Sequence, residues 1–182
     1  YKKEWFPEDG AAFPIRVSIM KDEVTVGLDT SGESLHKRGY RKLSSKAPIT
    51  ETLAAALILL TPWREDRILV DPFCGSGTLL IEAAQKALNI APGLKRRFAA
   101  EEYSFIPKEI WEEERKKARE AIKRDVEFKA YGFDIDPFVL EIAKQRKWDE
   151  LYYALCSVSF SQFTRKRKLD LELKKAVKLR RD

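Results

Sequence analysis

The sequence predicts an α/β fold in which an open sheet is flanked by helices and preceded by a β-hairpin. Three stretches support this. Residues 68–84 follow the order strand, glycine-rich turn, helix, and residues 126–143 follow the order strand, acidic turn, helix. Residues 15–29 contain two alternating apolar and polar runs joined by a polar turn, which indicates a hairpin. Open α/β sheets hold nucleotide-like ligands outside the carboxyl ends of their strands.

The first part of the chain is predicted to form the hairpin and then a loop. Ile15, Val17 and Ile19 alternate with polar residues, which predicts a half-buried strand, and a second alternating run ends at Leu28. Residues 29–41 are polar and basic and contain two glycines, so a loop is expected there.

A helix is expected to precede the first buried strand. Pro48 suits a first helical turn, where its missing N–H has no consequence. Leu53, Ala54 and Leu57 give this helix an apolar face, and Pro62 marks its end. A later helix is expected to begin at Pro107 by the same reasoning.

The stretch from Ile68 to Ala84 carries the main functional signal. Its apolar start indicates a strand buried on both faces, and Gly75 and Gly77 permit backbone angles and close approaches that a Cβ would forbid. A phosphate-binding loop would need a Lys followed by Ser or Thr after the second glycine, but Thr78 follows directly. A dinucleotide fingerprint would need a third glycine at Leu80. The alternative is a tight turn without a ligand.

An acidic residue ends the next predicted strand. Phe128 and Ala130 lead into Gly-Phe-Asp-Ile-Asp-Pro, which places Asp134 where a carboxylate can accept hydrogen bonds from two vicinal ribose hydroxyls. Asp136 precedes Pro137 and could equally be a helix N-cap.

Charge and composition narrow the class of protein. The formal net charge is +6, and the tail at residues 164–182 carries a surplus equal to that whole value. Such a tail attracts phosphate backbones or is simply solvated. No apolar run is long enough to span a bilayer, no signal peptide is expected, and no His/Cys cluster indicates a metal. Two cysteines are too few for a disulfide framework, which suits a reducing, cytoplasmic setting. The sequence has one histidine, His36, so a His-based catalytic triad would have to use it.

The motif Asp-Pro-Phe-Cys-Gly-Ser-Gly-Thr resembles the first motif of the S-adenosylmethionine-dependent methyltransferases that modify an exocyclic amine of a nucleobase. Together with Asp-Thr-Ser-Gly-Glu-Ser-Leu-His-Lys-Arg-Gly-Tyr-Arg and Lys-Ala-Pro-Ile-Thr-Glu-Thr, it resembles the THUMP-associated RNA guanine-N2 methyltransferases, best known from bacterial large-subunit rRNA. The resemblance covers roughly residues 5–145. It implies a Rossmann-like class I methyltransferase sheet, with a hairpin and linker region at 1–45 and a methyltransferase domain at 46–182.

The resemblance also implies roles for individual residues. S-adenosyl-L-methionine is expected to contact Asp71, Pro72, Phe73, Gly75, Gly77, Thr78, Asp134, Ile135 and Asp136. The start of the preceding helix is expected to face its methionine end through Ala47, Pro48, Glu51 and Thr52. RNA, expected to be rRNA, could be contacted by His36, Lys37, Arg38, Tyr40 and Arg41. The alternative is that this basic loop braces the cofactor site or packs on the preceding domain.

The resemblance fails after Gln145. The family has an Asn-Pro-Pro-Tyr motif that holds the target amine, and this sequence contains no Asn-Pro-Pro or Asp-Pro-Pro. We therefore assign no catalytic residue and hypothesise that segments are missing after about residue 145. Residues 151–155 and 169–173 are expected to be late strands.

Three functions remain open from the sequence. The first is guanine-N2 methylation of large-subunit rRNA, in which the amine displaces the sulfonium in line after its base is flipped out. The second is adenine-N6 methylation of DNA. The third is a truncated, non-catalytic module that binds cofactor or RNA. The sequence does not indicate the oligomeric state.

Overall fold

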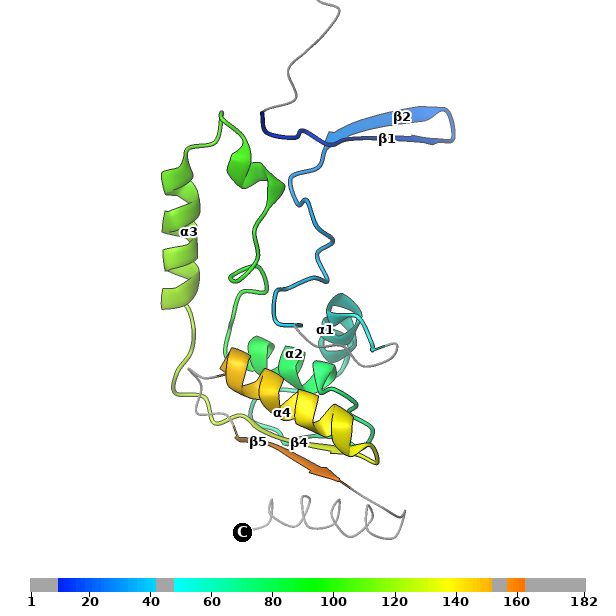
Figure 1. The fold of residues 1–182 in the computed structure, drawn as a ribbon, viewed down its shortest axis with the longest axis vertical. Helices are drawn as coiled ribbons and strands as arrows, with labels where there is room; N and C mark the ends of the chain where they lie inside the picture. Colours follow the sequence, from blue (N-terminus) through cyan, green and yellow to red (C-terminus); the bar gives the residue numbers. More distant parts are fainter. Residues whose placement is uncertain (1–9, 42–47, 152–156, 163–182) are drawn as a thin grey trace, which may run out of the picture.

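The computed structural model describes residues 10–41, 48–151 and 157–162. Within these ranges it is an α/β structure with four α-helices, one short 3-10 helix and two small sheets (Figure 1). No helix in these ranges is both long and apolar enough to cross a lipid bilayer.

The sheet that positions the site has three parallel strands in the order β3-β4-β5. They are β3 (Leu69–Asp71), β4 (Lys129–Asp134) and β5 (Ser157–Gln162). β4 is central, and Asp71 at the end of β3 is in register with Gly132 near the end of β4. The carboxyl ends of these two strands therefore meet at one edge of the sheet.

The four α-helices and the 3-10 helix of the described ranges lie between strands in chain order. They are α1 (Glu51–Leu60), α2 (Thr78–Ala87), α3 (Lys108–Glu120) and α4 (Pro137–Leu151), with the 3-10 helix η1 at Ala99–Glu102. α1 packs against α2, and α2 and α4 pack on the sheet, whereas α3 stands beside the long connection that contains η1 (Figure 1).

The main core surrounds α2. Leu80, Ala83 and Ala84 are fully buried because α2 faces the sheet, α1 and α4. The other buried members of this cluster are Ile58, Cys74, Ala87, Leu88, Phe128, Ala130 and Leu140. Truncating such a buried Leu to Ala typically costs about 2–5 kcal/mol of stability, so α2 is anchored firmly.

The hairpin is confirmed, but its predicted burial is wrong. β1 (Ile15–Met20) and β2 (Glu23–Leu28) pair antiparallel, as the alternation indicated. Both faces are exposed, with Val17 59% and Ile19 73% accessible. The reason is that the hairpin protrudes from the other described elements (Figure 1).

The boundaries of several elements differ from the prediction. α1 begins at Glu51, three residues after Pro48, because Thr50 is extended (φ −70°, ψ 147°). β3 is half-buried along its length, not buried on both faces. Leu151 ends α4 and does not begin a strand.

The last described strand, β5, was not predicted from the sequence. Its alternation of Val158 and Phe160 with serines was the available signal. The expected strand at 169–173 lies outside the described residues, as does the rest of the expected strand at 152–155.

Candidate functional site

The carboxyl ends of β3 and β4 and the first turn of α2 surround a pocket of about 820 Å³. Parallel strands with a helix between them leave such a crevice outside their carboxyl ends. The pocket is lined by Pro48, Ile49, Asp71, Phe73, Cys74, Gly75, Ser76, Thr78, Leu79, Asp134, Asp136, Phe138 and Val139.

The turn between β3 and α2 holds its backbone open toward this pocket. The N–H of Phe73 donates to Asp71 Oδ1 (3.1 Å), and that of Gly77 donates to the Cys74 carbonyl (2.8 Å). Gly75 and Gly77 adopt φ of 52° and 77°, which L side chains rarely adopt. A Cβ built on Gly75 would meet no heavy atom within 4 Å. The backbone of this turn can therefore contact a ligand directly.

Asp134 joins the two strand ends. Its Oδ2 accepts the N–H of Gly75 (2.9 Å), and its Oδ1 accepts the N–H of Asp136 (3.0 Å). These two hydrogen bonds fix the Asp134 carboxylate at the carboxyl end of β4. A carboxylate offers about four lone-pair sites, so the same two oxygens can still accept donors from a ligand.

The tripeptide Asp-Pro-Phe occurs twice, once at each strand end, and both copies form the same turn. Phe73 N–H donates to Asp71 Oδ1, and Phe138 N–H donates to Asp136 Oδ1 (2.8 Å). Both rings are exposed at the rim of the pocket, Phe73 by 73% and Phe138 by 68%. Two exposed aromatic rings beside a polar crevice suit a planar apolar group.

The electrostatics of the pocket favour hydroxyl donors and positive charge over anions. Burial raises the pKa of the Asp71 carboxyl, the nearby Asp134 carboxylate raises it further, and the N–H of Phe73 opposes both. Burial, Asp71 and Asp134 raise the pKa of Cys74 to about 12. The Cys74 thiol is therefore neutral and a poor nucleophile at neutral pH.

Arg41 ties the preceding loop to both helices at the pocket. Its Nη2 donates to the Ile49 carbonyl (2.8 Å) and to Thr78 Oγ1 (3.3 Å). Its Nε lies 3.0 Å from Glu51 Oε1, and Glu51 is only 2% exposed. The carboxylate of Glu51 is thus used inside the protein, and it does not line the pocket as the resemblance had implied.

The structure brings together most of the predicted cofactor residues. The predicted residues that line the pocket are Pro48, Asp71, Phe73, Gly75, Thr78, Asp134 and Asp136. Those that do not line it are Glu51, Thr52, Pro72, Gly77 and Ile135. Thr52 faces instead a separate hollow beside residues 27–36, and Ala47 lies outside the described residues.

The predicted RNA-contacting loop makes buried contacts with α2. Tyr40 is 2% exposed, and its hydroxyl donates to Glu82 Oε1 (2.7 Å). Arg38 Nη1 lies 3.1 Å from Glu82 Oε2. Burial and the Glu82 carboxylate raise the pKa of Tyr40. In this conformation the Tyr40 ring cannot stack on a base, which agrees with the bracing interpretation.

The other two residues of that loop have different surroundings. Lys37 Nζ pairs with Glu33 (3.0 Å) in an exposed position. His36 lines the hollow that also contains Thr52. Contact with RNA through this loop stays a prediction.

Six lining residues were missed from the sequence: Ile49, Cys74, Ser76, Leu79, Phe138 and Val139. Cys74 and Ser76 belong to the glycine-rich motif and could have been included on that ground. The repeated Asp-Pro-Phe would have identified Phe138.

The matching family model and similar curated proteins are all described as methyltransferases. The family model described as RMKL-like, methyltransferase domain, matches residues 38–174. The chain is 46% identical over 142 residues to the "Putative RNA methyltransferase YpsC" of Bacillus subtilis, covering 78% of this chain and 37% of that protein. It is 44% identical over 134 residues to ribosomal RNA large subunit methyltransferase K/L of Vibrio campbellii, covering 71% and 19%.

A solved structure extends the comparison to the fold. The crystal structure described as "SMU.472, a putative methyltransferase complexed with SAH" matches with a TM-score of 0.76 and 40% identity, covering 88% of this chain and 42% of that chain. The chain spans less than half the length of each of these relatives.

Proposed function

Because this chain belongs to the RMKL-like methyltransferase domain family, we propose that it forms the cofactor-binding part of an RNA methyltransferase. In this proposal β3, β4 and β5 belong to a Rossmann-like class I sheet, and the ligand is S-adenosyl-L-methionine. The family match and the complex of SMU.472 with SAH, the demethylated product of that cofactor, support it.

One observation carries the proposal: Asp134 and the open backbone at Gly75 face the same pocket and are hydrogen-bonded to each other at 2.9 Å. The donor and acceptor set fits the proposed ligand. The Asp134 carboxylate suits vicinal ribose hydroxyls, and the exposed Phe73 and Phe138 rings suit a flat adenine. The carboxylates of Asp71 and Asp134 suit a ligand that carries a positive sulfonium and an ammonium group.

When bound, the cofactor supplies a sulfonium-activated methyl group. The residues of this chain act on that ligand by holding it: Asp134 orients the ribose, and the turn at Gly75 lets the backbone approach closely. Arg41 fixes the start of α2 through Thr78, so the pocket keeps its shape. Such positioning is a large part of the rate enhancement in a displacement reaction. Among the described residues we assign none to proton transfer.

For the substrate we propose RNA, with the exocyclic amine of a guanine in large-subunit rRNA as the methyl acceptor. The names of the two curated relatives support RNA as the substrate class, and the second names large-subunit rRNA. The guanine N2 atom follows from the resemblance of the motifs. Duplex DNA is the competing substrate, and transfer of labelled methyl groups to rRNA and to duplex DNA separates the two.

The cofactor part is tested by calorimetric titration of the chain with S-adenosylhomocysteine. Asp134→Ala removes two hydrogen bonds to a charged acceptor, worth together about 3 kcal/mol or more, so we expect Kd to rise at least 100-fold. Asp66→Ala removes an exposed carboxylate outside the pocket and should leave Kd unchanged. Thermal melting without ligand establishes whether each variant is folded. A folded Asp134→Ala chain with the parental Kd would refute the proposed site.

A further inference from the structure

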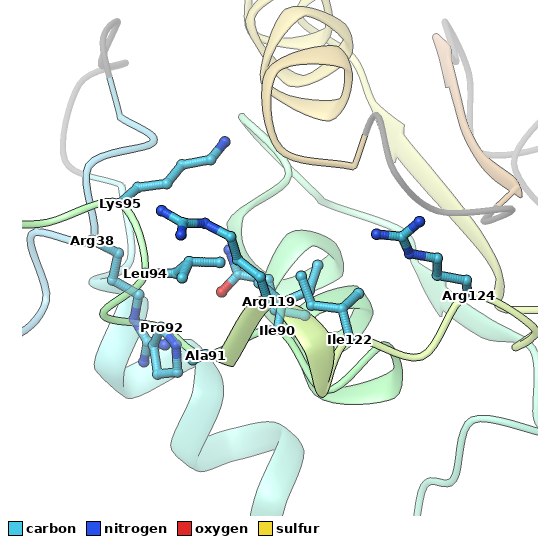
Figure 2. Close-up of a pocket in the computed structure, with 10 residues that line it drawn as sticks. Arg38, Ile90, Ala91, Pro92, Leu94, Lys95, Arg119, Ile122 and Arg124 are labelled. Atoms are coloured by element: carbon cyan, nitrogen blue, oxygen red, sulfur yellow. The ribbon is translucent and has the colours of Figure 1, made fainter. Parts of the chain in front are cut away.

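A second pocket has a volume of about 320 Å³. Figure 2 shows the side chains that line it. Its walls come from the second half of α2, the connection that follows it, the end of α3 and the loop at Arg38. It is lined by Arg38, Gln85, Ile90, Ala91, Pro92, Leu94, Lys95, Arg119, Ile122 and Arg124. None of these residues lines the first pocket.

The walls of this pocket are fixed to one another. Asn89 Nδ2 donates to the Ala121 carbonyl (3.1 Å), and Lys123 N–H donates to the Leu88 carbonyl (2.9 Å), which joins the end of α2 to the end of α3. Gly39 lies so close to Lys95 that a Cβ there would be 3.2 Å from the Lys95 carbonyl oxygen. The pocket is therefore a preformed feature and not a gap between loose segments.

The lining is strongly cationic. Four of its ten residues are Arg or Lys and none is acidic. Arg38 is anchored by Glu82, but no carboxylate within the described ranges pairs with Arg119 or Arg124. Figure 2 shows Lys95 and Arg119 extending to the same side of the pocket, with Arg124 at its other end beyond Ile122. Positive charge gathered around one cavity favours a ligand that carries phosphate.

The interior is apolar and includes one unsatisfied acceptor. Ile90, Leu94 and Ile122 supply aliphatic surface, on which the face of a nucleobase can pack. Gln85 is only 6% exposed, and its Oε1 has no hydrogen-bond partner among the described residues. A buried acceptor without a donor is unfavourable, so a ligand that brings an N–H would be favoured here.

We infer that this second pocket binds one unpaired nucleotide of the RNA substrate. Its base would lie on the aliphatic floor, with one flanking phosphate at Lys95 and Arg119 and the other at Arg124. The inference rests on the proposed function. The volume suits one nucleotide and excludes a duplex. Thr78 at the cofactor site and Gln85 are seven residues apart on α2, which is about 10 Å along a helix.

The test measures binding of a fluorescent single-stranded RNA, taken from large-subunit rRNA, over a range of salt concentrations. The test variant combines Arg119→Gln with Arg124→Gln. The matched control combines Arg64→Gln with Lys116→Gln, two exposed cations outside the pocket, and has the same net charge. Each phosphate contact on a single strand contributes about 0.7 to the slope of log K against log salt. We expect the test variant to lose about 1.4 in slope and about 25-fold in affinity at 0.1 M salt.

A second readout locates the base. RNA carrying 4-thiouridine is crosslinked to the unmodified chain by ultraviolet light, and the attached peptide is identified by mass spectrometry. Crosslinks within residues 90–95 or 119–124 support the inference, and crosslinks confined to other segments overturn it. If the test variant and the control bind alike, the pocket inference fails while the proposed function stands. If the unmodified chain binds no RNA but binds S-adenosylhomocysteine, the pocket inference fails while the proposed cofactor site stands.

Discussion

Removing one hydroxyl from the buried contact between the basic loop and α2 should destabilise the protein measurably. Tyr40 donates to Glu82 Oε1 at 2.7 Å, and both residues are at most 3% exposed. Hydrogen bonds to charged groups contribute about 1.5–3 kcal/mol, and water cannot replace the lost donor here. We expect Tyr40→Phe to lower the free energy of unfolding by about 2 kcal/mol.

The assay is urea unfolding followed by circular dichroism, with a thermal melt as a second measurement. For a chain of this length, a loss of about 2 kcal/mol corresponds to a fall in Tm of about 4–8 °C. Tyr131→Phe is the matched control, because Tyr131 is half-buried in β4 and its hydroxyl has no partner among the described residues. That control should change stability by less than about 0.5 kcal/mol.

A double-mutant cycle makes the reasoning refutable. If the hydroxyl acts through Glu82, the cost of Tyr40→Phe should shrink by about 1 kcal/mol or more in a Glu82→Gln background. Equal costs in both backgrounds would show that the Tyr40 hydroxyl does not act through the charge of Glu82. A loss below about 0.5 kcal/mol in the parental chain would refute the account of a buried, charge-assisted bond.

Two further predictions concern the same helix and its turn. The pKa of Glu82 lies above its ordinary value of 4.5, mainly because the carboxyl group is buried. The native state therefore binds more protons than the unfolded state above pH 4.5, and stability should fall as pH rises through this range. Urea titrations across that pH range should show a shallower fall for Glu82→Gln, and an unchanged profile would contradict the assignment. Gly75→Ala should lower stability by about 1–2 kcal/mol, because Gly75 has a positive φ that alanine adopts at a cost. It should also weaken S-adenosylhomocysteine binding, because the new Cβ would occupy open space beside the pocket. Calorimetry of the folded variant showing an unchanged Kd would contradict the close approach of ligand to this backbone.

The sequence was most informative where local chemistry alone dictates structure. Gly75 and Gly77 adopt the positive φ values that their spacing indicated, and Asp134 ends its strand as predicted. The hairpin also follows directly from its alternation. These features depend on residues that are neighbours in the chain, so a local pattern is sufficient to predict them.

Contacts between distant segments could not be predicted in this way. Glu82 is a polar residue on an amphipathic helix and would ordinarily be assigned to a solvated face. It is buried because Arg38 and Tyr40, more than 40 residues earlier, cover it. The same loop was predicted to contact RNA because its composition is basic. Composition does not show that two of its side chains are turned inward.

The position of Glu82 explains why the two pockets belong to one rigid unit. α2 begins at the proposed cofactor site with Thr78 and reaches the second pocket with Gln85. Glu82 lies between them and holds the preceding basic loop through Arg38. That loop lines the second pocket with Arg38 and contacts Thr78 through Arg41. Disturbing Glu82 should therefore weaken binding at both places, although it lines neither. Substitutions at Asp134 and at Arg119, which lie at the two ends of this arrangement, should each affect only the nearer pocket. That contrast distinguishes coupling through α2 from a general loss of stability, because a general loss would weaken both sites in every variant.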